Sequence, residues 1–161
     1  MFWKKRIQLD AYCHGTLSHI FSSHYDDVAD TLLARGPATF KDAVDRDWYL
    51  ANLHAACIQL LGVALARNLQ RDQRSDALLQ VSAFLESGAH TEVEGLRRQY
   101  NQAFGSDPED GVRAMASLFA QACGASEADR GDVQRLHHDA FFEVLNALFK
   151  NIKSVRVVVS V

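Results

Sequence analysis

Residues 49–69, YLANLHAACIQLLGVALARNL, constrain the fold more than any other segment, because they are apolar almost all the way round a helix. In the middle of this segment only His54 and Gln59 carry strongly polar side chains. At about 100° per residue, the large apolar side chains cover more than half of the circumference, and small residues occupy the rest. A surface helix of a globular protein has a narrower apolar stripe. We therefore expect a central buried helix over about residues 40–69, with other helices packed on most of its sides.

His54 falls on the bulky apolar face of this helix, between Leu61 and Leu65. A buried imidazole loses free energy on folding unless its ring nitrogens find hydrogen-bond partners. The simplest interpretation is a neutral histidine that is bonded to a carbonyl or hydroxyl group inside the core. The two alternatives are a metal or cofactor ligand and a ring that reaches solvent.

Helix signals recur along the rest of the chain, which holds only two prolines and nine glycines in 161 residues. The clearest is Asp107-Pro108-Glu109-Asp110, where a capping side chain precedes a proline at the first helical position and acids in the first turn. Hydrophobic residues make up 48% of the chain, as in ordinary globular proteins. We predict an all-α fold, a compact irregular bundle of five to seven helices around the central helix, in a single domain over residues 1–161.

Residues 75–104 allow two interpretations. An apolar stripe at helical spacing continues through the whole segment, which favours one long helix. Gly88 can end a helix, however, and Thr91 with Glu94 forms a capping-box pattern that starts one. We favour a kink or a short break at this point, which leaves open whether the segment forms one helix or two.

The two ends of the chain depart from the helical pattern. In SVRVVVSV every second residue is a valine on one side of an extended chain: Val155, Val157, Val159 and Val161. This alternation predicts a short β-strand at 155–161, and FWKKRIQL places Trp3 in a second extended segment. A lone valine-rich strand would be an edge that is prone to pairing. Either the two ends form a small antiparallel ribbon against the helices, or the C-terminal strand pairs with its copy to form a homodimer, or the tail is frayed.

Seven histidines in a helical chain raise the hypothesis of a metal site. His54 and Cys57 lie one turn apart, and His137 and His138 on the last helix align with apolar neighbours. Imidazole and thiolate groups are common ligands of transition metals. The Glu-x-x-His repeats of di-iron bundles and the HExxH motif are absent from the sequence. We therefore predict no cofactor, and keep as an alternative a metal bound by His54, Cys57 and either His137 or His138.

Motifs for nucleophilic catalysis and for phosphate or dinucleotide binding are also absent, which favours a protein that is not an enzyme. The net charge of −3 gives no basic field for nucleic acid. The sequence contains no run of 18 apolar residues, so we expect no transmembrane segment. Three widely spaced cysteines form no disulfide framework, which favours a cytoplasmic protein with reduced thiols.

The function that fits this pattern best is a non-catalytic helical protein that acts through protein–protein interaction or self-association. Its predicted interaction residues are Trp3 and the alternating valines of the C-terminal strand. The alternative is a helical bundle that binds a small apolar ligand or a metal in its core.

Overall fold

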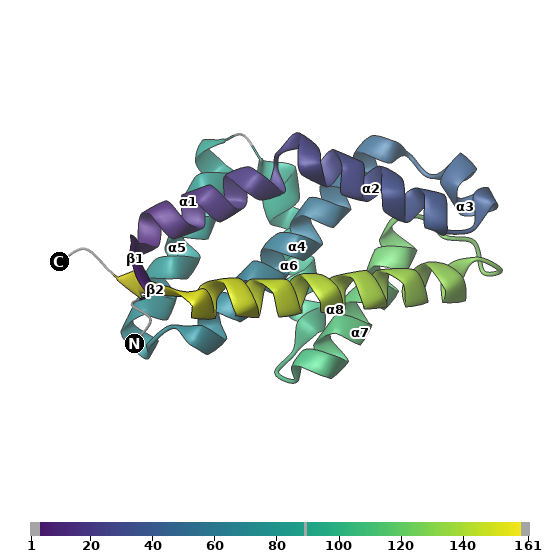
Figure 1. The fold of residues 1–161 in the computed structure, drawn as a ribbon. Coiled ribbons are helices and arrows are strands. Elements are labelled where there is room, and N and C mark those ends of the chain that lie inside the picture. The colour runs from purple at the N-terminus through teal and green to yellow at the C-terminus, as the bar shows by residue number, and fades with distance from the viewer. Residues whose placement is uncertain (1–3, 89, 159–161) are drawn as a thin grey trace.

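The computed structural model describes residues 4–88 and 90–158, and it is helical apart from one small sheet (Figure 1). In chain order these residues form β1 (Lys5–Gln8), α1 (Leu9–Ile20), α2 (Ser23–Arg35), α3 (Ala38–Ala43), α4 (Arg46–Asn68), α5 (Arg71–Ser87), α6 (Thr91–Phe104), α7 (Pro108–Ala122), α8 (Arg130–Ser154) and β2 (Val155–Val158). The predicted fold class is confirmed, although the described residues form eight helices where five to seven were expected.

The central helix is α4, and α1, α2, α5, α6, α7 and α8 all pack against it. Every residue from Asn52 to Leu61 is buried, as the all-round apolar pattern predicted. The length and mean hydropathy of α4 would allow it to cross a membrane. Of the most apolar 18-residue stretch of this helix, however, 72% is buried by the rest of the fold. Such burial is typical of a core helix.

Two of the polar side chains within α4 find partners in neighbouring elements. The Asn52 side chain donates to the Trp48 carbonyl at 2.9 Å and accepts from the Tyr100 hydroxyl at 2.8 Å. Gln59 donates to the side-chain oxygen of Asn101 at 3.0 Å. Because paired amides avoid most of the cost of burial, the core tolerates both residues.

The central helix begins later than the sequence pattern suggested, at Arg46 rather than at about residue 40. Val44 has an extended backbone and separates α3 from α4. The Asp45 side chain accepts a hydrogen bond from the Trp48 amide at 2.8 Å and so caps α4. The break predicted within residues 75–104 is confirmed, since α5 ends at Ser87 and α6 begins at Thr91.

The strands β1 and β2 lie side by side and pair in parallel, with Arg6 opposite Arg156 and Ile7 opposite Val157. The two ends pair with each other, as one of the alternatives held, but not as an antiparallel ribbon. Alternation fixes which face of a strand is buried but not the direction of its neighbour. Ile7, Val155 and Val157 pack on the helices, as the alternation predicted, while Arg6 and Arg156 are exposed.

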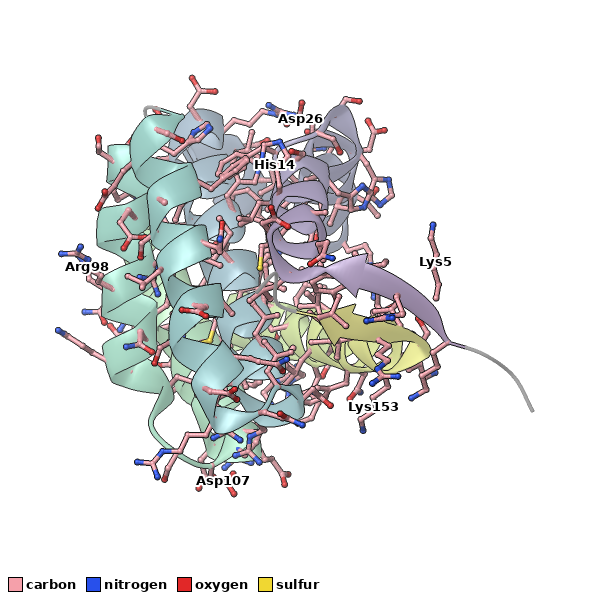
Figure 2. All side chains as sticks on the ribbon, turned by 90° about the vertical axis from the view of Figure 1, so that its left-hand side faces the viewer. Lys5, His14, Asp26, Arg98, Asp107 and Lys153 are labelled. Carbon is pink, nitrogen blue, oxygen red and sulfur yellow. The ribbon has the colours of Figure 1, made fainter. Side chains whose placement is uncertain are left out.

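Basic residues gather where the two strands meet the solvent. Figure 2 shows Lys5 and Lys153 on the same side of the molecule, near the paired strands. The predicted interaction residues Trp3, Val159 and Val161 lie outside the described residues. The predictions for their side chains therefore stay predictions.

Candidate functional site

A groove of about 760 Å³ runs between α2 and α8, and we call it the α2–α8 groove. In Figure 1 these two helices cross the same face of the molecule, with α4 behind them. Leu53 and Cys57 of α4 line the groove, together with Phe141 of α8. All three of these side chains are buried, so the bottom of the groove is apolar.

The α8 wall of the groove is an apolar stripe at helical spacing: Leu136, Ala140, Val144, Ala147 and Leu148. These side chains are half-buried or exposed. Val28 and Leu32 form the apolar part of the opposite wall on α2. A helix normally buries such a stripe against another helix, yet no element of residues 4–88 and 90–158 fills the space between these two walls.

The rim of the groove is polar, and acids outnumber permanent cations along it. Asp27, Asp139 and Glu143 line the groove, against one arginine, Arg35. His19 also lines it and stacks on the neighbouring imidazole of His24, with 5.1 Å between the ring centroids. The rim therefore favours a ligand that carries positive charge beside an apolar surface.

Cys57 and Tyr25 contact each other at the bottom of the groove and are held in their neutral forms. Burial raises the pKa of Cys57 to about 12, and burial also raises the pKa of Tyr25 well above its usual range. A protonated thiol is a poor nucleophile and a poor metal ligand, so this pair provides a surface for packing.

His54 is buried on the bulky face of α4, as predicted, with 8% of its surface exposed. Its ring packs on Phe21, with 4.7 Å between centroids, and lies near Tyr25. Burial lowers its pKa to about 4, so the ring is neutral at neutral pH. Its Nε2 atom is buried without a hydrogen-bond partner among the described residues. The expected carbonyl or hydroxyl partner is therefore absent from that nitrogen.

His137 has the environment that the sequence suggested for His54. Its Nδ1 lies 2.7 Å from the Val133 carbonyl oxygen, and its Nε2 lies 2.6 Å from the Tyr49 hydroxyl. A carbonyl oxygen only accepts, so Nδ1 carries the proton and Nε2 accepts from Tyr49. The ring stacks on Phe119, and burial lowers the pKa of His137 to about 4.

The four predicted ligand residues do not share one set of neighbours. His54 and Cys57 both adjoin Tyr25, and His137 lies against Tyr49 and Phe119. His138 is half-buried next to Asp139 and packs on Phe142. Within residues 4–88 and 90–158, no group of three or more His, Cys, Asp or Glu side chains is placed to hold a metal ion.

The sequence pattern does not distinguish the α8 wall of the groove from a buried helix face. The stripe from Leu136 to Leu148 has the same spacing as a buried stripe, and the acids Asp139 and Glu143 lie within it. These interleaved acids were the available signal, because a fully buried face would exclude them.

No protein-family model, no curated protein and no solved structure matches this chain. No residue role is therefore carried over from another protein. The candidate roles of the groove residues follow from their geometry and chemistry alone.

Proposed function

We propose that this chain is a non-catalytic binding protein whose α2–α8 groove accepts an amphipathic helix from a protein partner. One observation carries the proposal, which is the apolar stripe that α8 presents to an empty groove. From Leu136 to Asn151 this wall is roughly 22 Å long at the rise of an α-helix. A partner helix of similar length would bury its apolar face on α8, α2 and the residues of α4 below.

The charges at the rim specify the flanks of the partner helix. Asp27, Asp139 and Glu143 favour lysine or arginine residues on either side of an apolar stripe. Arg35, the one arginine of the groove, also lines a smaller adjoining hollow together with Leu136 and Asp139. The proposed ligand is therefore a basic amphipathic helix.

The neutral groups at the bottom of the groove support a binding role over a catalytic one. A catalytic nucleophile or base needs a pKa matched to its task. Burial moves the pKa of Cys57 to about 12, away from that range. The pKa of Tyr25 also moves upward, away from the value a general base needs.

A matched pair of variants tests the groove. Ala147 lines it, whereas the adjacent Asn146 does not, and both side chains are exposed. Ala147→Arg would fill the groove without burying a charge, and Asn146→Arg makes the same change in charge elsewhere on α8. The probe is a fluorescein-labelled helical peptide with leucines at positions i, i+3, i+4 and i+7 and flanking lysines, measured by fluorescence anisotropy.

We expect Ala147→Arg to weaken binding of this peptide at least roughly tenfold, because it removes the space for an anchor side chain. Asn146→Arg should leave the affinity within about twofold. A version of the peptide with glutamates in place of lysines should bind more weakly to the wild-type protein. Equal affinities for the two variants would contradict the proposal.

A second candidate function is the binding of a small apolar ligand, which the size of the groove favours. Its volume of about 760 Å³ lies within the range of roughly 300–1,000 Å³ that is typical of ligand pockets. A fatty alcohol that raises the melting temperature of the wild-type protein, but not of Ala147→Arg, would support this candidate. A melting temperature that falls with a chelator would instead support the metal alternative.

A cytoplasmic location belongs to the same proposal. Cys13, Cys57 and Cys123 are free and buried, and reduced thiols suit a reducing compartment. Self-association remains part of the proposal where the partner helix comes from a second copy. A mass that rises with protein concentration and is altered by Ala147→Arg would identify that case.

A further inference from the structure

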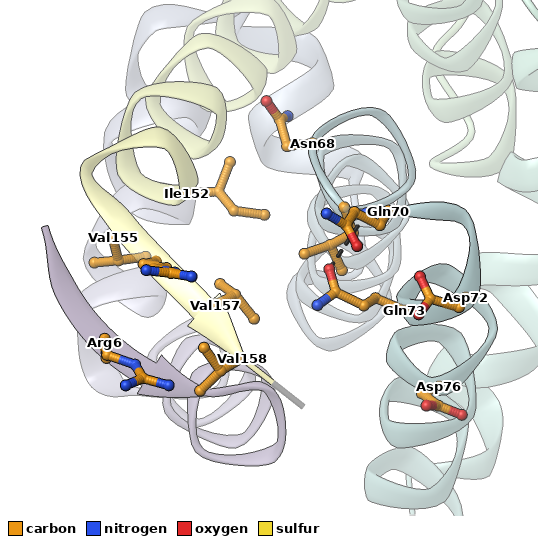
Figure 3. A pocket seen from close by; sticks show the side chains of 12 residues that line it. Arg6, Asn68, Gln70, Asp72, Gln73, Asp76, Ile152, Val155, Val157 and Val158 are labelled. Carbon is orange, nitrogen blue, oxygen red and sulfur yellow. Dashed lines mark hydrogen bonds between the residues drawn. The ribbon is translucent and has the colours of Figure 1, made fainter. Parts of the chain in front are cut away.

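A second groove lies at the open edge of β2, and we call it the β2-edge groove (Figure 3). Among residues 4–88 and 90–158 the sheet has two strands, so the edge of β2 away from β1 pairs with no other strand. That edge faces a space of about 760 Å³, and the first turns of α5 form the opposite wall. Unpaired backbone donors and acceptors on such an edge are a template for another strand.

The edge of β2 is only four residues long, which limits pairing, but the strand carries few of the other features that protect exposed edges. Natural edge strands carry prolines, bulges or several lysines, whereas β2 reads Val-Arg-Val-Val. Leu69 and Ile152 line the groove and are buried. An extended segment placed beside β2 would therefore have an apolar surface beneath one of its faces.

The strand side of the groove is strongly basic. Arg6 and Arg156 are directly opposite each other in the parallel register, and both line the groove. Neither forms an ion pair with any acid in the described part of the chain. Like charges directly opposite each other are destabilising, and an acidic group between them would relieve the repulsion.

We propose that the β2-edge groove binds an extended acidic segment of a partner protein, which adds to the sheet as a third strand beside β2. Its backbone bonds to the free edge of β2. Its side chains alternate, so that apolar residues face Leu69 and Ile152 while glutamate or aspartate residues face Arg6 and Arg156.

The wall of the groove formed by α5 can bind the outer edge of the added strand. Gln70 and Gln73 at the start of α5 are occupied by their mutual capping box. Asp72 and Asp76 line the groove from α5 (Figure 3). Carboxylates accept hydrogen bonds from backbone N–H groups, so these two residues can bind the outer amides of the added strand. This site is separate from the α2–α8 groove and does not depend on its function.

The probe for this site is a short fluorescein-labelled peptide of alternating glutamate and valine, and the control peptide has lysine in place of glutamate. We expect the acidic peptide to bind the wild-type protein and the basic peptide to bind at least about tenfold more weakly. Arg156→Glu should reduce the affinity for the acidic peptide roughly tenfold and raise that for the basic one. Arg130→Glu makes the same change in charge at the other end of α8 and should leave both affinities within about twofold.

Two further peptides test strand addition itself. Alternate amides of a strand point to opposite edges, so N-methylation of the set that faces β2 should abolish binding, whereas methylation of the set that faces Asp72 and Asp76 should weaken it by a clearly smaller factor. Because Arg6 and Arg156 are exposed, the melting temperature of Arg156→Glu should be at least that of the wild type, which confirms folding.

Equal loss with the two methylated peptides would overturn the proposal, because binding would then not follow one strand edge. Unchanged affinity of the acidic peptide for Arg156→Glu would overturn it as well. A dimer in sedimentation analysis that competes with the acidic peptide would assign the edge to a second copy of this chain instead of a partner.

Discussion

Two buried histidines lie in different regions of the core and differ in the hydrogen bonding of their ring nitrogens. Between α4, α7 and α8, His137 has a partner for each ring nitrogen and stacks on Phe119. Between α1, α2 and α4, His54 packs among the rings of Phe21 and Tyr25, and its Nε2 has no partner within residues 4–88 and 90–158. Burial lowers the pKa of both histidines to about 4.

The difference shows that a lowered pKa does not distinguish a satisfied imidazole from an unsatisfied one. For both rings the dominant cause is the removal of water from the charged form. The hydrogen bond to the Val133 carbonyl raises the pKa of His137, but by less than burial lowers it. In the neutral form, the hydrogen-bond partners decide whether the buried ring stabilises the fold or costs free energy. We therefore expect the two sites to respond alike to acid and differently to substitution.

Acid should produce the largest effect, and it should act on both sites. The pKa of each histidine falls from 6.5 in the unfolded chain to about 4 in the folded one, so the unfolded state binds more protons between these values. The free energy of unfolding is therefore greatest above pH 6.5. It decreases as the pH falls toward 4, by up to roughly 3 kcal/mol for each ring. Asp26 and His90 act on His54 in opposite directions and weakly compared with burial.

Urea denaturation across this pH range measures the effect. His54→Leu should remove about half of the pH dependence, whereas His24→Leu, at an exposed site, should change it little. An unaltered pH dependence in His54→Leu would mean that the ring of His54 is already hydrated in the folded state.

Substitution of His54 should produce the next largest effect, and the sign depends on the charge introduced. His54→Asp places an unpaired carboxylate among Phe21 and Tyr25 and should lower the free energy of unfolding by at least about 3 kcal/mol. His54→Leu removes the unpartnered Nε2 and should stay within roughly 1 kcal/mol of the wild type. Comparable melting temperatures for the two variants would contradict the expected difference between the environments of His54 and His137.

Tyr49→Phe should produce the smallest effect, and it turns His137 into a counterpart of His54. The variant leaves the buried Nε2 of His137 without its donor and should cost about 1–2 kcal/mol in the free energy of unfolding. Tyr12→Phe is the matched control, because its partner Asn151 is exposed and can bond to water instead. A control that costs as much as Tyr49→Phe would show that burial of the partner is not what matters.

The sequence predicted the parts of the fold that depend on local periodicity. The burial of α4 and the side of the helix that carries His54 follow from side-chain spacing, which a single helix defines by itself. The break between α5 and α6 follows from local capping signals.

The rest depends on which elements meet in space, and periodicity does not contain that information. His54 and His137 both lie among apolar residues in the sequence, and only the fold places Tyr49 at one ring and Phe21 at the other. The stripe from Leu136 to Leu148 has the spacing of a core face, yet the fold leaves it open. The parallel direction of β1 and β2 likewise depends on how α1 and α8 approach the sheet.

The pairing of Lys5 with Val155 brings together residues 150 positions apart in the sequence. On the ribosome, β1 is made about 150 residues before its partner strand β2. Such distant contacts form slowly, so the helices are expected to assemble first and the two strands to join last. During synthesis Ile7 would then be uncovered, and chaperones that recognise nascent extended segments would find β1 accessible over that whole interval.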